Sequence, residues 1–272
     1  MGRFLRTYAH VFAVGWQNTF TYRWNFVLRS LFSFVPLIGT VFLWRAIYEG
    51  HPEGSLATRY DYPQMIFYFL LSILVNLLTV PTEDEWQIAS DIRDGFINSI
   101  LLKPIDYFTY RYCLFAAYRL VYTLVAVTPV LIALWIFRHT VRWPEHAETY
   151  LAFAVSLMLS GTLQFLIAYS IALLAFWIQE VSTLVFIVYA FEVFFSGQMF
   201  PLDILPPAWV TVSWWLPFQY EIYFPVQVFQ ERLTPSQVWG GLCIAAGWVG
   251  AGWMGARCIY RSGLKHYTAV GG

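Results

Sequence analysis

Charge is scarce in this sequence. Asp, Glu, Lys and Arg make up 12% of its 272 residues, against roughly 25% in soluble domains. Sixteen basic residues balance sixteen acidic ones, so the chain has no positive excess of the kind that binds nucleic acid, and we expect no nucleic-acid partner. Cysteine is also rare, and Cys113, Cys243 and Cys258 lie in or beside apolar runs. Their spacing predicts neither disulfides nor a metal site.

Several motifs that carry chemistry are absent as well. The sequence contains no G-x-x-x-x-G-K-[ST] loop for nucleotide phosphates, no H-E-x-x-H and no G-x-S-x-G. Without the phosphate loop, this chain does not supply an ATPase of that type. We therefore expect no catalytic residues, no metal and no cofactor in the chain itself.

Apolar and aromatic residues are abundant, at 59% and 20% of the chain. About 20 apolar residues form a helix that crosses the ~30 Å hydrocarbon core of a bilayer. The pattern predicts an all-α polytopic membrane protein, with one transmembrane domain over residues 1–272 and six transmembrane helices. The predicted spans are residues 25–47, 63–80, 114–137, 150–178, 181–200 and 238–256. In the last span Gly247, Ala251 and Gly255 repeat every four residues, which predicts a close-packing face.

The basic residues predict how these spans are oriented. With a cytosolic N-terminus, nine of the thirteen Lys and Arg residues outside the spans lie on the cytosolic side. The four on the outer side are Arg59, Arg138, Arg142 and Arg232. Because cytosolic loops carry the excess of basic residues in membrane proteins, we expect both termini to be cytosolic.

The N-terminal segment, residues 1–24, has the pattern of an amphipathic helix. Phe4, Phe12 and Trp16 fall on one face of such a helix, whereas Arg3 and His10 fall on the other. This pattern predicts a helix that lies at the membrane interface. A helix packed under the protein itself fits the pattern equally well.

Residues 81–108 form the longest polar stretch between two apolar segments, and the predicted topology places them in the cytosol as a coupling region. Apolar residues recur there at three- and four-residue spacing, as a stripe of Ile88, Ile92, Phe96 or Ile97, and Ile100 or Leu101. This spacing predicts one short amphipathic helix. The short cytosolic loops offer no evident partner for the stripe, so we expect a separate protein to cover it.

Residues 197–235, after the fifth predicted span, are apolar but interrupted by prolines at positions 201, 206, 207, 217 and 225. Proline breaks a continuous helix, so we expect a re-entrant helical hairpin at the outer leaflet. Non-helical backbone at that depth is tolerated only against protein or a water-filled cavity, and the hairpin is therefore expected to border the exit path. The alternative is an ordinary aromatic-rich external loop.

Two polar residues within predicted spans require an explanation. Glu192 lies midway along the fifth span, where a charged side chain costs roughly 2.5–3.5 kcal/mol on insertion scales. We interpret it as part of a translocation path, together with Gln198 and Phe200 at the end of that span. Arg119 in the third span is expected to snorkel toward the cytosol, with Tyr118 and Tyr122 around it.

Two stretches together resemble a known family. Residues 90–107 read SDIRDGFINSILLKPIDY, with an arginine, a nearby glycine, a leucine pair and a proline. Residues 196–209 read SGQMFPLDILPPAW, and LPF follows at residues 216–218. In this order, with an amphipathic N-terminal helix and six spans, the chain resembles the integral-membrane subunits of type-2 ABC exporters over essentially its whole length.

The resemblance implies partners and a mechanism. Two copies of an ABC ATP-binding subunit would dock beneath two permease subunits, the second identical or homologous to this chain. ATP and Mg²⁺ would bind to the ATPase, and the chain would carry an amphipathic drug, lipid or peptide across a bacterial plasma (inner) membrane, in contact with membrane lipid. The residues that the resemblance assigns to ATPase coupling are Ile88, Asp91, Ile92, Arg93, Asp94, Gly95, Phe96, Ile97 and Leu101.

Two other functions are compatible with a polytopic membrane protein, a prenyltransferase and a secondary transporter. A membrane prenyltransferase would hold Mg²⁺ and diphosphate between two aspartate-rich cytosolic loops. Residues 81–108 would supply one such loop, but the cytosolic connection between spans four and five has Glu180 as its only acid. A secondary transporter that works without ATP would be expected to show inverted repeats and more charge at mid-membrane. The sequence shows neither, so the exporter interpretation is favoured.

Overall fold

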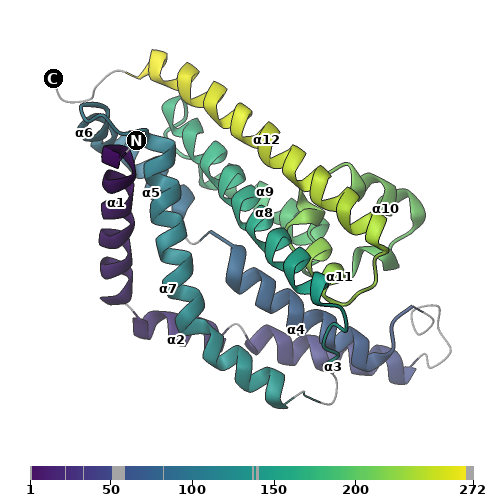
Figure 1. Cartoon of the computed structure of the whole chain (residues 1–272). Coiled ribbons are helices and arrows are strands. Elements are labelled where there is room, and N and C mark those ends of the chain that lie inside the picture. The colour runs from purple at the N-terminus through teal and green to yellow at the C-terminus, as the bar shows by residue number, and fades with distance from the viewer. Residues whose placement is uncertain are drawn as a thin grey trace.

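The computed structural model describes residues 2–21, 23–32, 34–50, 59–81, 83–136, 138 and 141–267. Every regular element within these ranges is a helix (Figure 1), which confirms the predicted all-α class. Three helical stretches of the described chain are long and apolar enough to cross a membrane, namely Tyr62–Arg93, Ala147–Phe176 and Pro235–His266. The six-span topology stays a prediction.

The elements in chain order are α1 (Gly2–Thr21), α2 (Arg23–Phe32), α3 (Phe34–Gly50), α4 (Tyr62–Thr79), α5 (Asp84–Arg93), α6 (Phe96–Leu101), α7 (Tyr107–Ile136), α8 (Ala147–Ala172), the 3₁₀ turn η1 (Leu173–Phe176), α9 (Ser182–Phe195), η2 (Leu202–Ile204), α10 (Pro207–Trp214), η3 (Phe218–Tyr220), α11 (Tyr223–Phe229) and α12 (Pro235–His266). The expected span over residues 25–47 thus corresponds to two helices, α2 and α3.

The helices α8 and α12 lie side by side over much of their length (Figure 1). Glycines spaced eleven residues apart on α12 face three different neighbours: Gly241 faces Phe224 of α11, Gly252 faces Leu166 of α8 and Gly263 faces Phe176 of η1. An eleven-residue interval keeps residues on one face of a helix. The expectation that Gly247 and Gly255 pack closely within the subunit was wrong, because no atom of another described element lies within 4 Å of a Cβ built at either position.

The N-terminal helix α1 packs along α7. The Tyr8 hydroxyl accepts a hydrogen bond from the Asp106 backbone N–H at 2.9 Å, and a Cβ at Gly15 would lie 3.1 Å from the Leu114 side chain. Helix α1 therefore packs against the protein, and its location at the membrane interface stays a prediction.

The proline-rich segment between α9 and α12 contains two short helices, α10 and α11, so the expectation that no continuous span forms there is confirmed. Helix α11 is buried against α4 and α8, with Val226 and Phe229 in one cluster with Met65 and Leu71 of α4. The segment is joined to the end of α9 by a hydrogen bond from the Tyr223 backbone N–H to the Ser196 carbonyl, at 2.8 Å.

Candidate functional site

The coupling region consists of two helices rather than the single helix expected from the sequence. Helix α5 ends at Arg93 and α6 begins at Phe96. Between them Gly95 has φ +78°, in the left-handed region that glycine adopts without steric cost. The apolar spacing continues across this break, which is why the sequence pattern alone did not reveal it.

The apolar stripe of these helices is covered by the chain itself, so the expectation of an uncovered stripe was wrong. Ile88, Ile92, Ile97 and Ile100 are all buried, and Ile92 is only 2% exposed. They pack in one cluster whose other members come from α7, α8, η1 and α12. The stripe therefore anchors the coupling region to the membrane helices.

Polar contacts strengthen this anchor. Asp91 forms an ion pair with Arg111 of α7, and the Tyr107 hydroxyl donates a hydrogen bond to the same carboxylate at 2.8 Å. The Arg93 guanidinium donates to the Gln179 carbonyl at 2.9 Å, in the turn between η1 and α9. Asp91 thus faces inward, and the exposed Arg93 ties α5 to a second part of the chain.

Apart from Trp86 of α5, the large apolar residues exposed in this region lie at α6 and just after it. Phe96 is 50% exposed, Leu101 is also exposed, and Leu102 is 89% exposed. Leu102 was missing from the residues predicted from the sequence, although the leucine pair before Lys103 and Pro104 was the available signal. Together Phe96, Leu101 and Leu102 form what we call the α6 tip. Asp94, also exposed, lies beside it.

The chain that follows α6 is fixed to α12. Arg257 donates two hydrogen bonds to the Asp106 carboxylate, at 2.5 and 3.0 Å, and Asp106 also accepts from the Thr109 backbone N–H and hydroxyl. Burial by itself would raise the pKa of the Asp106 carboxyl, but the hydrogen bonds from Arg257 and Thr109 outweigh it and lower the pKa. Asp106 therefore stays ionised, and its ion pair with Arg257 joins the start of α7 to the C-terminal part of α12.

Further from the α6 tip, a chain of buried polar groups crosses the helices. The Gln164 amide donates to the Thr79 hydroxyl at 2.9 Å and to the Ser160 hydroxyl at 3.1 Å. Ser160 in turn donates to the Glu221 carbonyl at 2.5 Å. These contacts show that Gln164 and Ser160 of α8 serve packing between helices.

Glu192, the first path residue predicted from the sequence, lies close to other acids. Its charge interacts with that of Glu85 at the start of α5 and with that of Glu221, which follows η3. Glu221 is 3% exposed, and its Oε1 atom has no hydrogen-bond partner among the described residues. Sequence reasoning missed Glu221, although an acid within an apolar, proline-rich stretch is a detectable signal.

The other two predicted path residues lie elsewhere. Gln198 lines a cavity of about 210 Å³ between α3 and α4, next to Ser72 and Asn76, and Glu192 is not among its lining residues. Phe200 packs against Phe194 of α9, with ring centroids 5.4 Å apart. The structure therefore does not bring the three residues together in one site.

Arg119 is buried rather than snorkelling. It donates a hydrogen bond to the Leu77 carbonyl at 3.0 Å, and its guanidinium lies over the rings of Tyr118 and Tyr122, at 5.6 and 5.2 Å from their centroids. The predicted tyrosine surroundings are present. The buried position shows that Arg119 links α7 to α4 within the subunit.

An all-helical chain with long apolar helices and an anchored polar connection between two of them has the organisation of a membrane transport subunit. Comparison with protein-family models matches residues 34–271 to the description "ABC-2 family transporter protein". No curated protein matches the chain. The chain therefore belongs to the ABC-2 transporter family and is a membrane-embedded permease component of an ABC exporter, a class that associates with an ABC ATP-binding subunit.

Proposed function

We propose that the chain is the permease of an ATP-driven exporter, in which two permeases, identical or homologous, form the path and two ATP-binding subunits dock on their cytosolic side. The observation that carries this proposal is the α6 tip. Phe96, Leu101 and Leu102 are apolar and exposed, and all three lie within residues 96–102. Exposed apolar clusters on the aqueous side of a protein mark sites of association with other proteins.

The anchoring of α5 explains how docking at the tip would move the membrane helices. A displacement of α6 is passed to α7 through the ion pair of Asp91 with Arg111. It is passed to the start of α9 through the hydrogen bond from Arg93 to Gln179. The buried isoleucine stripe resists separation of α5 from α8. A closing ATPase dimer would therefore pull on several spans together.

The substrate path is proposed to pass the acids that meet between α5, α9 and η3. Glu192 interacts electrostatically with Glu85 and with Glu221, and maintaining an acid such as Glu192 within a predicted span is costly unless it serves a purpose. With the aromatic surroundings, these acids favour an amphipathic substrate. Glu192→Gln is expected to leave assembly intact and alter substrate-stimulated ATP hydrolysis. Unchanged stimulation and export would remove Glu192 from the path.

The docking proposal is tested by co-purification of the ATPase with tagged permease variants. Leu102→Asp places a carboxylate on a side chain that is 89% exposed, so folding is little affected. Desolvating an unpaired carboxylate in the interface costs several kcal/mol, so ATPase recovery is expected to fall about a hundredfold. Phe96→Asp is expected to act in the same direction.

The matched control is His266→Asp, which adds a carboxylate to an exposed residue at the cytosolic end of α12. It is expected to leave ATPase recovery at the level of the unmodified permease. Normal recovery and turnover with both Leu102→Asp and Phe96→Asp would place the docking surface outside the α6 tip.

A further inference from the structure

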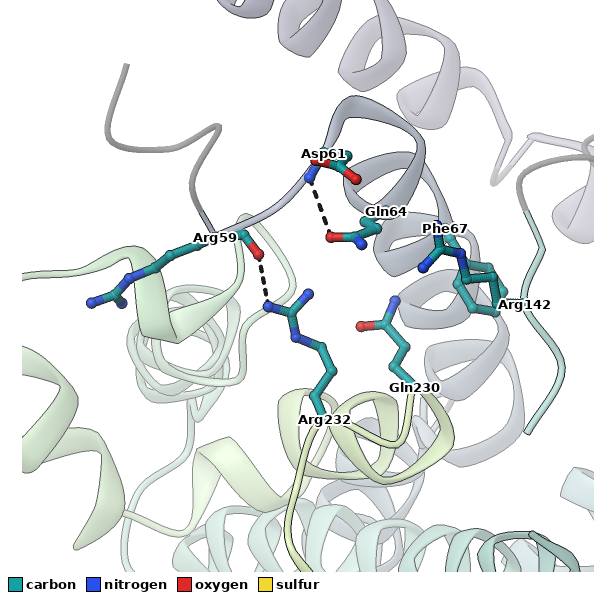
Figure 2. Close-up of a pocket in the computed structure, with 7 residues that line it drawn as sticks. All are labelled: Arg59, Asp61, Gln64, Phe67, Arg142, Gln230 and Arg232. Atoms are coloured by element: carbon teal, nitrogen blue, oxygen red, sulfur yellow. Dashed lines mark hydrogen bonds between the residues drawn. The ribbon is translucent and has the colours of Figure 1, made fainter. Parts of the chain in front are cut away.

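At the end of the molecule that holds the α7–α8 connection, arginines line a cavity of about 390 Å³ (Figure 2). Its lining residues come from the segment before α4, from α4 itself, from the connection before α8 and from the connection after α11. They are Arg59, Asp61, Gln64, Phe67, Arg142, Gln230 and Arg232. Three of the four basic residues that the predicted topology places outside, all except Arg138, thus line one cavity, and the Arg59 guanidinium is directed away from it (Figure 2).

The groups that face this cavity are mainly hydrogen-bond donors. Figure 2 shows the guanidinium groups of Arg142 and Arg232 on opposite sides of the cavity, with the amides of Gln64 and Gln230 between them. The Gln64 Oε1 atom accepts a hydrogen bond from the Asp61 backbone N–H at 3.2 Å, which leaves its NH₂ group available. Asp61 contributes the only carboxylate among the lining residues.

Arg232 is held in place by its surroundings. Its Nη2 atom donates a hydrogen bond to the Arg59 carbonyl at 2.8 Å, and its guanidinium carbon lies 3.9 Å from the centroid of the Tyr60 ring. The Tyr60 hydroxyl donates to Asp203 and accepts from the Gln227 amide at 2.8 Å. A guanidinium stacked in this way is pre-organised to bind an anion.

Glu231, which separates Gln230 from Arg232, is directed to the start of α8. It has a φ of +54°, and its carboxylate accepts hydrogen bonds from the backbone N–H groups of Glu145 and His146, at 3.2 and 3.1 Å. The carboxylate is thus engaged at the α8 N-terminus, while its two neighbours line the cavity. This arrangement removes a negative charge that would compete with an anionic ligand.

We propose that this cavity, which we call the arginine pocket, binds an anionic phosphate group, either the phosphodiester of a lipid headgroup or free phosphate. Arginine binds phosphate oxygens through paired N–H donors. The volume of about 390 Å³ lies within the roughly 300–1,000 Å³ of small-molecule sites, which favours a headgroup. Its outward orientation depends on the proposed topology, whereas binding itself depends on neither the topology nor an ATPase.

The proposal is tested by native mass spectrometry and thermal unfolding of the purified full-length permease in detergent. The two probes are phosphatidylglycerol and inorganic phosphate. Unmodified permease is expected to retain phosphatidylglycerol, and Arg142→Gln combined with Arg232→Gln is expected to weaken retention about tenfold or more. The matched control is Arg138→Gln, because Arg138 lies over the Trp135 ring at 5.7 Å and does not line the pocket.

The outcomes separate the two ligand sources. If millimolar inorganic phosphate displaces the lipid and raises the unfolding temperature to the same extent, the ligand is the free anion, and otherwise it is the headgroup. Arg142→Gln alone decides the matter if the double variant does not fold, because Arg142 is exposed and precedes α8. The proposal would be overturned if unmodified permease retained neither probe. It would also be overturned if a folded pocket variant retained the lipid as well as unmodified permease does, or if Arg138→Gln caused an equal loss.

Discussion

At the scale of single residues, Glu231 illustrates how one side chain fixes a helix that is distant in the sequence. The first N–H groups of a helix lack partners within it and are satisfied by capping groups. At the start of α8 the carboxylate of Glu231 accepts a hydrogen bond from the Thr149 hydroxyl at 2.7 Å, in addition to those from Glu145 and His146. The negative charge also complements the positive end of the helix dipole.

These contacts lower the pKa of Glu231 to about 2, with the hydrogen bond from Thr149 as the largest cause and those from the His146 and Glu145 backbone next. Because folding lowers the pKa from 4.5, the ionised carboxylate stabilises the folded state fully above about pH 4.5. This contribution is lost as the pH falls from there toward 2.

We therefore expect Glu231→Gln to lower the unfolding temperature of the purified permease at pH 7. The difference from the unmodified protein should shrink as the pH falls below about 4.5. Thermal unfolding between pH 3.5 and 7 measures it, and Glu148→Gln, an exposed acid in the first turn of the same helix, is the control. A difference that is independent of pH would contradict the capping role.

At the scale of elements, the coupling region has two parts with different roles. Helix α5 and the inner side of α6 belong to the hydrophobic core through the isoleucine stripe. The α6 tip is directed outward with Phe96 and Leu102. A substitution in the isoleucine stripe should therefore lower the stability of the permease, whereas a substitution at the α6 tip should lower ATPase recovery.

Ile92→Ala is expected to destabilise the isolated permease by about 2–5 kcal/mol, because it removes a buried side chain and leaves a cavity. Phe96→Ala, at a position that is 50% exposed, is expected to change stability little and to reduce ATPase recovery. Denaturant or thermal unfolding of the permease alone, followed by co-purification, separates the two effects. Equal destabilisation by Ile92→Ala and Phe96→Ala would show that the Phe96 side chain is not directed away from the core.

At the scale of the whole molecule, the two sites lie at opposite ends of the long helices. One end holds the α6 tip and the Asp106–Arg257 ion pair, and the other holds the arginine pocket. The first end carries the larger share of basic residues in the predicted topology. The positive-inside rule therefore predicts that the α6 tip lies in the cytosol and the arginine pocket on the outer side.

This orientation is tested with single cysteines in a permease whose Cys113, Cys243 and Cys258 have been replaced by serine. A cysteine at Glu145, which is exposed before α8, should react with an impermeant maleimide in intact cells. One at Lys103, exposed after α6, should react only after the cells are opened. The reverse pattern would invert the topology.

The sequence by itself determined the features that depend on local composition and periodicity. Long apolar runs predict membrane helices because backbone groups in hydrocarbon must be satisfied within the helix. The prolines between residues 201 and 225 exclude a continuous span. The family resemblance depended on local strings within residues 90–107 and 196–209, and the match over residues 34–271 confirmed it.

Only the tertiary structure decided which faces are covered and which distant residues meet. Periodicity identifies an apolar stripe but not what it packs against, and the stripe from Ile88 to Ile100 proved to be covered by α7, α8 and α12. The convergence of Arg142 and Arg232, the proximity of Glu221 to Glu192, and the capping of α8 by Glu231 all join segments far apart in the chain. Such contacts depend on how the helices pack in three dimensions, and a sequence pattern confined to neighbouring residues does not contain that information.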